Sequence, residues 1–442
     1  MKNRRDFLRH TLGVGAGIAA AQQVFAQSHD HNMNMKMTHS THPLPPTLPL
    51  VQVSSPDIPT LAWTANDGAK EFHLVAEPVK RKLMPGRDMQ VWGYNGSCPG
   101  PTIEVNQGDR VRILFENHLP ESTSMHWHGL EVPVAMDGMP FVSQKPVPPG
   151  GKFVYEFSLH QEGTYFYHSH GAMQEMMGMI GMFVIHPREA YQPRIDHDFG
   201  IILQEWAILP NSDVPNTANM EFNWLTFNGK AAPDITPLLV RQGSRAKIRL
   251  VNMGMDHHPI HLHGNSFVVT GSEAGRQPES TWGPGNTVLV GVAQARDIEF
   301  VAKNPGDWML HCHLPHHMMN SMSDLMSDRM MSPMRLDDKN ALQQMQTYAD
   351  AEKFEHVHHS PIAKDAVTVP GFPQDAFMEM AMDTAVYRPE NYGLPKNWSA
   401  DMAGMMTLVR ILPDEMYDKI MAMKGEPAPA PAPETPSEHH HG

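Results

Sequence analysis

Short runs in which apolar residues alternate with polar ones recur after residue 60, and each predicts a β-strand. In the first part of the chain these runs are Glu71–Val75, Gln90–Tyr94, Thr102–Val105, Arg110–Asn117, Phe153–Leu159 and Met182–Ile185. Turns rich in glycine and proline separate them, as at Cys98–Pro101 and Pro148–Gly151. This spacing is typical of a Greek-key sandwich or barrel.

The same plan returns from Phe199 onward. The later runs are Leu238–Arg241, Val288–Val292, Asp297–Val301 and Trp308–His311. Asn228-Gly229, followed by Gly243, parallels Asn95-Gly96 followed by Gly108, which is an internal repeat at the scale of a domain. We therefore predict an all-β protein with two copies of one Greek-key unit. A Met-rich, partly helical or irregular extension follows, with a helix expected over 338–352.

Candidate chemistry is concentrated at the end of the last of these runs, where His311-Cys312-His313 is followed by His317 and Met322. Side chains on a strand alternate between its two faces, so Cys312 should point away from both flanking histidines. A Cys, a His and a weakly bound Met are ligands of blue copper centres. One short strand could therefore contact two metal sites on opposite sides.

Composition narrows the function. The formal net charge of −14 argues against a nucleic-acid partner. Methionine (35) and histidine (28) are abundant, and both ligate copper. The two cysteines could pair by count alone, but Cys312 is needed for copper, so we expect Cys98 to be a small buried thiol.

The N-terminal segment has the features of an export signal. Arg4 and Arg5 precede a short apolar run from Leu12 to Ala21, which is typical of a twin-arginine (Tat) signal peptide. We expect cleavage after Ala26 and a periplasmic or secreted product. The apolar run is too short to span a bilayer, and no membrane span is expected in the mature protein.

Three further His-x-His pairs precede the Cys312 motif, at His126/His128, His168/His170 and His261/His263, with His258 just before the last pair. These four blocks, in this order, closely resemble the multicopper oxidase family. The resemblance implies cupredoxin-like domains. Only residues 171–257 separate the second and third blocks, and this span cannot hold another domain of ~100 residues beside the early strands of the second. The chain thus resembles the two-domain, small laccase-like type, with the blue copper site in the second domain because Ser169 stands where Cys312 does.

The resemblance also implies four copper ions per functional unit. The type 1 copper takes His258, Cys312, His317 and Met322, with Met405 or Met406 as the alternative axial ligand because an insertion separates the Gly404-Met405-Met406-Thr407 strand from the motif. The type 2 copper takes His126 and His261. The two type 3 coppers take His128, His168 and His313, and His170, His263 and His311.

The same resemblance implies that Asp137 supplies protons near the cluster, although an aspartate before Gly138 is also a common turn residue. It implies a homotrimer in which the trinuclear cluster forms between subunits. The predicted organisation is a signal peptide (1–26), a flexible arm (27–60), two domains (61–190 and 191–335), an insertion (336–400), a returning strand (401–425) and a disordered tail (426–442).

Several functions fit these residues. The first is a laccase-like oxidase that oxidises a small-molecule reductant such as a phenol and reduces dioxygen to water. The second is a metallo-oxidase that oxidises Cu(I), favoured by the many thioethers, which select Cu(I). A copper-sequestering protein would need no such partition of ligands. A copper nitrite reductase would need a blue site in the first domain.

Overall fold

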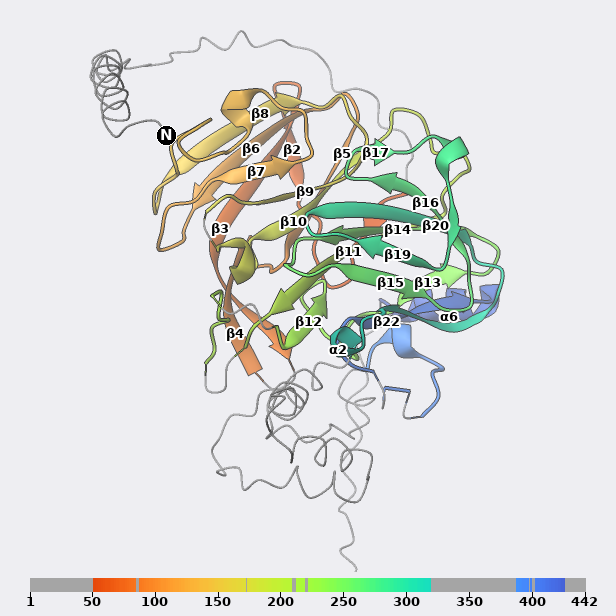
Figure 1. The fold of residues 1–442 in the computed structure, drawn as a ribbon. Helices are drawn as coiled ribbons and strands as arrows, with labels where there is room; N and C mark the ends of the chain where they lie inside the picture. The colour runs from red at the N-terminus through yellow and green to blue at the C-terminus, as the bar shows by residue number, and fades with distance from the viewer. Residues whose placement is uncertain are drawn as a thin grey trace, which may run out of the picture. The chain divides into compact units, whose positions relative to one another are not determined.

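The computed structural model describes residues 51–84, 87–171, 173–208, 212–218, 222–318, 387–396, 398–399 and 402–425. Within them the chain is built mostly of strands, which confirms the all-β prediction (Figure 1). No helix in these ranges is long and apolar enough to cross a membrane. The expected helix at 338–352 and Met322 lie outside the described residues.

The first β-sandwich consists of two sheets. One has the order β2-β3-β6-β8, with β4 paired to β3, and the other has the order β5-β10-β9-β7. The strands are β2 (Trp63–Asn66), β3 (Ala69–Met84), β4 (Arg87–Tyr94), β5 (Gly100–Asn106), β6 (Arg110–Asn117), β7 (Met125–His128), β8 (Lys152–Ser158), β9 (Gly163–Ser169) and β10 (Ile180–His186). Alternate residues of β6 are buried, and both sheets contribute to one apolar core.

The second β-sandwich repeats this design with one sheet ordered β1-β11-β14-β20-β16-β17 and another ordered β13-β22-β21-β15-β19. Short strands β12 and β18 extend the first of these sheets. The strands are β1 (Val53–Ser54), β11 (His197–Trp206), β12 (Trp224–Phe227), β13 (Leu238–Arg241), β14 (Arg245–Asn252), β15 (His258–Leu262), β16 (Phe267–Ser272), β17 (Gly275–Arg276), β18 (Pro284–Gly285), β19 (Thr287–Val290), β20 (Gln294–Val301), β21 (Gly306–Cys312) and β22 (Met406–Leu412).

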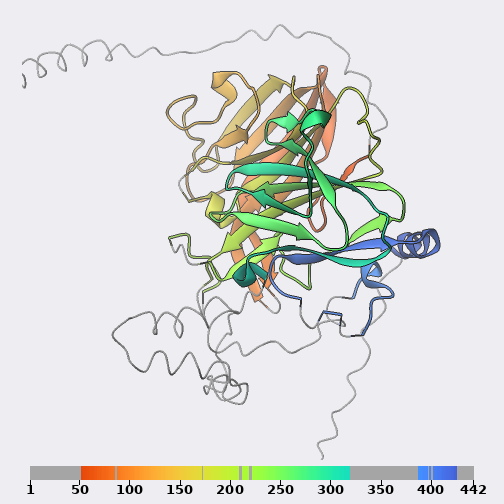
Figure 2. The same ribbon diagram turned by 45° about the vertical axis from the view of Figure 1, so that its right-hand side comes forward.

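Helices are few and short in the part of the chain that the structure describes. They are α2 (Pro315–Met318), α6 (Asp414–Met423) and the 3-10 turns η1 (Val134–Met136), η2 (Glu175–Met177), η3 (Glu279–Thr281) and η4 (Pro389–Asn391). In Figure 2, β22 and α6 (both blue) lie beside green strands of the second sandwich, where β22 pairs with β21 and β13. Residues 53–54 of the predicted arm form β1, which pairs with β11.

Equivalent strands pair in the same register in the two sandwiches, and this includes the positions of their histidines. In the first, β7 and β9 are antiparallel with His126 opposite His168. In the second, β15 and β21 are antiparallel with His261 opposite His311. Ser169 and Cys312 each end the equivalent strand, one residue after the paired histidine. The repeat predicted from sequence is therefore also a repeat of candidate ligand positions.

A buried ionic network joins the sandwiches. Arg249 on β14 forms two 2.8 Å contacts with the carboxylate of Asp198 and donates to Thr164 Oγ1 of the first sandwich at 2.7 Å. Thr164 in turn donates to Asp297 at 2.6 Å, and Lys247 pairs with Asp297 at 2.8 Å. Burial raises the pKa of Asp297, but the Lys247 and Arg249 cations lower it further, so the pKa lies below its ordinary value. The network lies beside apolar contacts that also join the two sandwiches.

Candidate metal centre

Strand β21 separates its last side chains onto two faces. The rings of His311 and His313 lie 5.3 Å apart, with further histidine rings around them. Cys312, between them, is fully buried and its Sγ faces His258 and His317 instead. This is the arrangement that the alternation of a strand predicts.

The Cys312 side holds three converging donor atoms. Cys312 Sγ lies 3.7 Å from His258 Nδ1 and 3.4 Å from His317 Nδ1, and the two ring nitrogens are 3.1 Å apart. His258 comes from the start of β15, and His317 comes from α2 just after β21. All three side chains are buried. We call this group the thiolate site.

Glu205, which sequence reasoning missed, lies against the back of this site. Its Oε1 is 2.5 Å from His258 Nε2, and the side chains of both residues are fully buried. A charged acceptor at Nε2 keeps the proton there, so that Nδ1 presents a lone pair toward Cys312. The only hint in the sequence was the position of Glu205 near the end of the apolar run that forms β11. An acidic residue at such a position is expected to be a buried carboxylate.

A soft metal ion fits the thiolate site. Two imidazole nitrogens and a sulfur face one another without an intervening polar group, and a thiolate with two imidazoles is a donor set for copper. Burial raises the pKa of Cys312 to about 12, so a metal ion must displace the thiol proton on binding. The predicted axial ligand Met322 lies outside the described residues. Met405 is buried beside the site, and its backbone bonds to Cys312 and His317.

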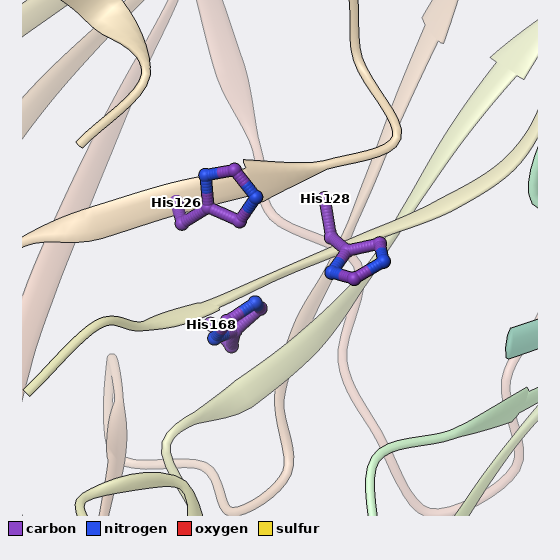
Figure 3. A group of neighbouring side chains, drawn as sticks. All are labelled: His126, His128 and His168. Atoms are coloured by element: carbon purple, nitrogen blue, oxygen red, sulfur yellow. The ribbon is translucent and has the colours of Figure 1, made fainter. Parts of the chain in front are cut away.

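Four imidazoles gather on the first sandwich, which we call the N-terminal half-site. His126 and His128 come from β7, His168 from β9, and His170 follows it. Their ring centroids lie 5.3–5.9 Å apart in the recorded pairs. Figure 3 shows three of them, His126, His128 and His168, beside the two strands.

Backbone carbonyls orient these rings for metal binding. His126 Nδ1 donates to Asp137 O at 2.8 Å, and His168 Nδ1 donates to Ser169 O at 2.8 Å. Each Nε2 then has a lone pair that it can offer to a metal ion. The buried His168 Nε2 has no hydrogen-bond partner among the described residues. Burial lowers the pKa of His128 to about 4, which keeps this ring neutral as a ligand must be.

The second sandwich carries the matching C-terminal half-site of His261, His263, His311 and His313. Ring centroids lie 4.8–5.6 Å apart, and His263 Nε2 is 3.0 Å from His311 Nε2. His311 Nδ1 donates to Cys312 O at 2.8 Å, repeating the contact of His168 with Ser169. Burial lowers the pKa of His263 and of His311.

The two half-sites stay apart within one chain. Ring contacts join histidines inside each group, and none of those recorded for the described residues joins one group to the other. The structure thus brings together the eight predicted cluster ligands as two sets of four.

Two carboxylates lie beside the N-terminal half-site. Asp137 Oδ1 is 3.4 Å from His126 Nδ1 and is partly exposed, and Asp137 also closes η1 before Gly138, so its position is compatible with both interpretations of this residue. Glu175, which sequence reasoning missed, has its Oε1 2.9 Å from His168 Nδ1. Its place in η2, five residues after His170, gave no motif by which to find it.

Two cupredoxin-like sandwiches with a thiolate site and paired imidazole half-sites define a class of copper-binding protein. Residues 76–190 and 209–329 match two family models, each described as multicopper oxidase. The chain belongs to the multicopper oxidase family.

Similar proteins carry several names. Copper resistance protein A of Pseudomonas syringae pv. tomato is 32% identical over 37% of this chain and 27% of its own length. Laccase-1 of Cryptococcus neoformans var. neoformans is 40% identical over 32% of this chain and 22% of its own length. The crystal structure of the blue copper oxidase from Nitrosomonas europaea is similar with a TM-score of 0.51 and 28% identity, covering 56% of this chain and 80% of that one. The chain thus spans well under half the length of the curated relatives it matches.

Proposed function

We propose that the chain is a laccase-like oxidase, which couples one-electron oxidation of a reductant at a type 1 copper to four-electron reduction of dioxygen to water at a trinuclear copper cluster. The observation that carries this proposal is the end of β21, where Cys312 faces the thiolate site while His311 and His313 belong to the C-terminal half-site. When bound, copper supplies reversible one-electron chemistry and a place for dioxygen.

Different residues of the chain would bind the different copper ions. The proposed type 1 ligands are His258, Cys312, His317 and Met322. The proposed type 2 ligands are His126 and His261. The type 3 ligands would be His128, His168 and His313 for one ion and His170, His263 and His311 for the other. The peptide from Cys312 to its two neighbours is the shortest covalent connection between the sites.

The acids hold and supply protons. Asp137 and Glu175 each contact the Nδ1 side of a ligand imidazole, where they favour the Nδ1–H tautomer and leave Nε2 for metal. We propose that Asp137, which is partly exposed, also passes protons from solvent toward the cluster. Oxygen uptake by the copper-loaded protein with a phenol tests the function, and a loaded protein that consumes no oxygen would refute it.

The separation of the half-sites within one chain supports assembly from several subunits, and we propose a homotrimer in which one subunit's N-terminal half-site meets the next subunit's C-terminal half-site. A cyclic arrangement of this kind closes on itself. The loop beside Asp137 supports it, because Val134, Phe141 and Val142 are apolar and 73–86% exposed.

Subunit mixing tests this assembly. We expect a His126→Ala/His128→Ala variant and a His261→Ala/His263→Ala variant each to be inactive. Co-refolded in equal amounts, they should recover about one quarter of wild-type activity, because every mixed trimer has one interface with two intact half-sites. Each variant refolded alone is the control. No recovery on mixing would mean that the cluster is completed within one chain.

The second candidate is a metallo-oxidase that oxidises Cu(I). It is favoured by a cavity lined with four methionine side chains near the half-site on the first sandwich. Similarity to a copper resistance protein is compatible with this candidate. The ratio of kcat/KM for Cu(I) to that for a phenol decides between the two. Export by the twin-arginine route, to the periplasm or the cell exterior, belongs to the proposal in either case.

A further inference from the structure

The first sandwich holds a group of buried polar side chains at the place where the second sandwich holds the thiolate site. Because His168 and His311 occupy equivalent positions, residues at equal spacing from them along the chain correspond. By this count the three thiolate-site residues have three counterparts, which are Thr123 for His258, Ser169 for Cys312 and Gln174 for His317. The three counterparts are at most 2% exposed. Their hydroxyl and amide groups are not the soft donors of a blue copper centre, so they serve another purpose.

The Gln174 amide is the centre of this group, which we call the Gln174 network. Its Oε1 accepts from the Thr123 hydroxyl at 2.7 Å and from the Ser169 hydroxyl, and the two hydroxyl oxygens are 2.9 Å apart. Its Nε2 donates to Glu121 Oε1 at 2.7 Å and to Ser122 O at 3.0 Å. One buried side chain thus joins the segment before β7 to the end of β9, and its removal would leave several buried groups without a partner.

The backbone repeats the correspondence between the two sandwiches. In the first, Ser169 N donates to Met179 O at 3.1 Å, and Met179 N donates to Gln174 O at 3.3 Å. In the second, Met405 makes the same two bonds with the two equivalent residues of the thiolate site, both at 3.0 Å. The two loops therefore share one backbone arrangement, and the side chains that close them differ.

His170 is the half-site ligand that this network holds most directly, because it lies one residue beyond the end of β9. Its backbone N donates to Ser124 O at 3.1 Å. The next residue, Gly171, donates to Ser169 Oγ at 3.0 Å, and its carbonyl accepts from Gln174 N at 3.2 Å. The loop that carries His170 is thus attached to the Gln174 network on both sides.

Gly171 leaves the space that the Gln174 amide occupies. A Cβ added at Gly171 would collide with Cδ, Oε1 and Nε2 of Gln174. The φ of Gly171 lies outside the left-handed region, so glycine is needed here for space and not for its conformational freedom. The equivalent position in the second sandwich is Leu314, beside a site that contains no amide. Glycine and glutamine therefore form one device in the first sandwich.

We propose that Gln174 is a positioning residue for the trinuclear cluster, whose amide holds the loop of His170 where copper at the thiolate site would hold the equivalent loop of His313. The inference rests on the proposed function, in which the eight half-site histidines bind copper. The ring of His170 lies 5.6 Å from that of His126 and 5.9 Å from that of His168, so a shift of its loop changes the spacing of the half-site. The thiolate site, on the other sandwich, does not depend on this loop.

Equilibrium competition for copper on the full chain tests this role. Q174A should weaken binding of the copper that His170 would ligate by about 10–100-fold, the loss typical when a group that orients a metal ligand is removed. Its type 1 copper and blue absorbance should stay at the wild-type level. Q204A truncates another buried glutamine, on β11 of the second sandwich, and is the matched control that should load every copper as the wild type does. Unchanged cluster copper in Q174A would overturn the role, and so would an equal loss of cluster and type 1 copper.

G171A is a second variant that leaves every hydrogen-bonding side chain in place. Its added Cβ should displace the Gln174 amide and weaken the same copper. In the G171A/Q174A double variant the amide is absent, so the loss should equal that of Q174A alone. Losses that add would overturn the proposal, because Gly171 would then hold His170 without Gln174.

The wild type separates this inference from the oxidase function. A wild-type protein that loads all its coppers but consumes no oxygen with any reductant would refute the oxidase function and leave the role of Gln174 standing. A wild-type protein that binds type 1 copper and none at the half-sites would overturn both.

Discussion

Glu205→Gln tests how a buried carboxylate controls the thiolate site. The change preserves the shape of the side chain but removes its charge. With its oxygen in the place of Oε2, the glutamine still accepts from the backbone N–H of Met255, 3.0 Å away, but the Asp256 N–H, 3.2 Å from Oε1, loses its acceptor. Its NH₂ group then faces His258 Nε2 and can only donate. His258 must therefore move its proton to Nδ1, the atom that should bind copper.

The magnitude follows from burial. The Glu205 and His258 side chains are fully buried and only 2.5 Å apart, so their contact is a charge-assisted hydrogen bond inside the protein. Such bonds contribute about 1.5–3 kcal/mol. Removing a carboxylate that orients a metal-ligating histidine typically weakens metal binding by about 10–100-fold. We expect a loss of this size at the type 1 copper.

The assay is equilibrium competition for copper, followed by the blue absorbance of the type 1 centre. Glu175→Gln is the matched control, since it makes the same change beside His168 and should leave the blue absorbance and type 1 affinity unchanged. Glu205→Gln should retain the coppers of the trinuclear cluster. If it bound type 1 copper as tightly as wild type, Glu205 would not determine the orientation of His258.

Two further predictions concern the thiolate and the core. Cys312→Ser should abolish the blue absorbance and turnover while leaving trinuclear copper bound by metal analysis; a variant that stays blue would overturn the ligand assignment. Asp297→Asn should lower the free energy of unfolding by about 3–5 kcal/mol in urea titrations, because it leaves Lys247 and Arg249 buried without their shared partner. Asp414→Asn, at a 78% exposed side chain, should cost about 1 kcal/mol or less. Because the folded pKa of Asp297 is depressed, its contribution is present above the unfolded value of 3.8 and is lost as pH falls through the folded pKa, so the difference between Asp297→Asn and wild type should shrink only in strong acid. A difference that shrank near neutral pH would contradict this.

The sequence predicts features that depend on local periodicity. The two-residue periodicity of a strand is enough to predict that Cys312 and His311 point to opposite faces. The return of the chain as β22 could be inferred from Gly404-Met405-Met406-Thr407. Helix α6 was also within reach, because Pro413 precedes it and Asp414 and Glu415 open its first turn. The segment 401–425, predicted as a returning strand, thus contains β22 and then α6.

The supporting acids could not be predicted in this way. Glu205 lies 53 residues before His258, on β11 of the opposite sheet, and meets it only because the two sheets of the second sandwich pack face to face. Glu175 reaches His168 from a 3-10 turn, where no strand periodicity applies. Metal ligands are fixed by local spacing, while the residues that orient them depend on tertiary packing, which a single sequence does not show.

The equivalence of Ser169 and Cys312 explains why one chain carries a single thiolate site but two half-sites. Ser169 ends β9 and Cys312 ends β21, and these equivalent strands pair with their neighbours in the same register. Each sandwich therefore offers the same geometry. Without a sulfur, the first sandwich keeps only its outward imidazoles, and the second keeps both functions. In the proposed function, copper at the thiolate site needs one folded chain, whereas oxygen reduction needs an N-terminal and a C-terminal half-site brought face to face. Blue absorbance and oxygen consumption should therefore have different requirements for assembly, linked by the proposed exchange of half-sites between subunits.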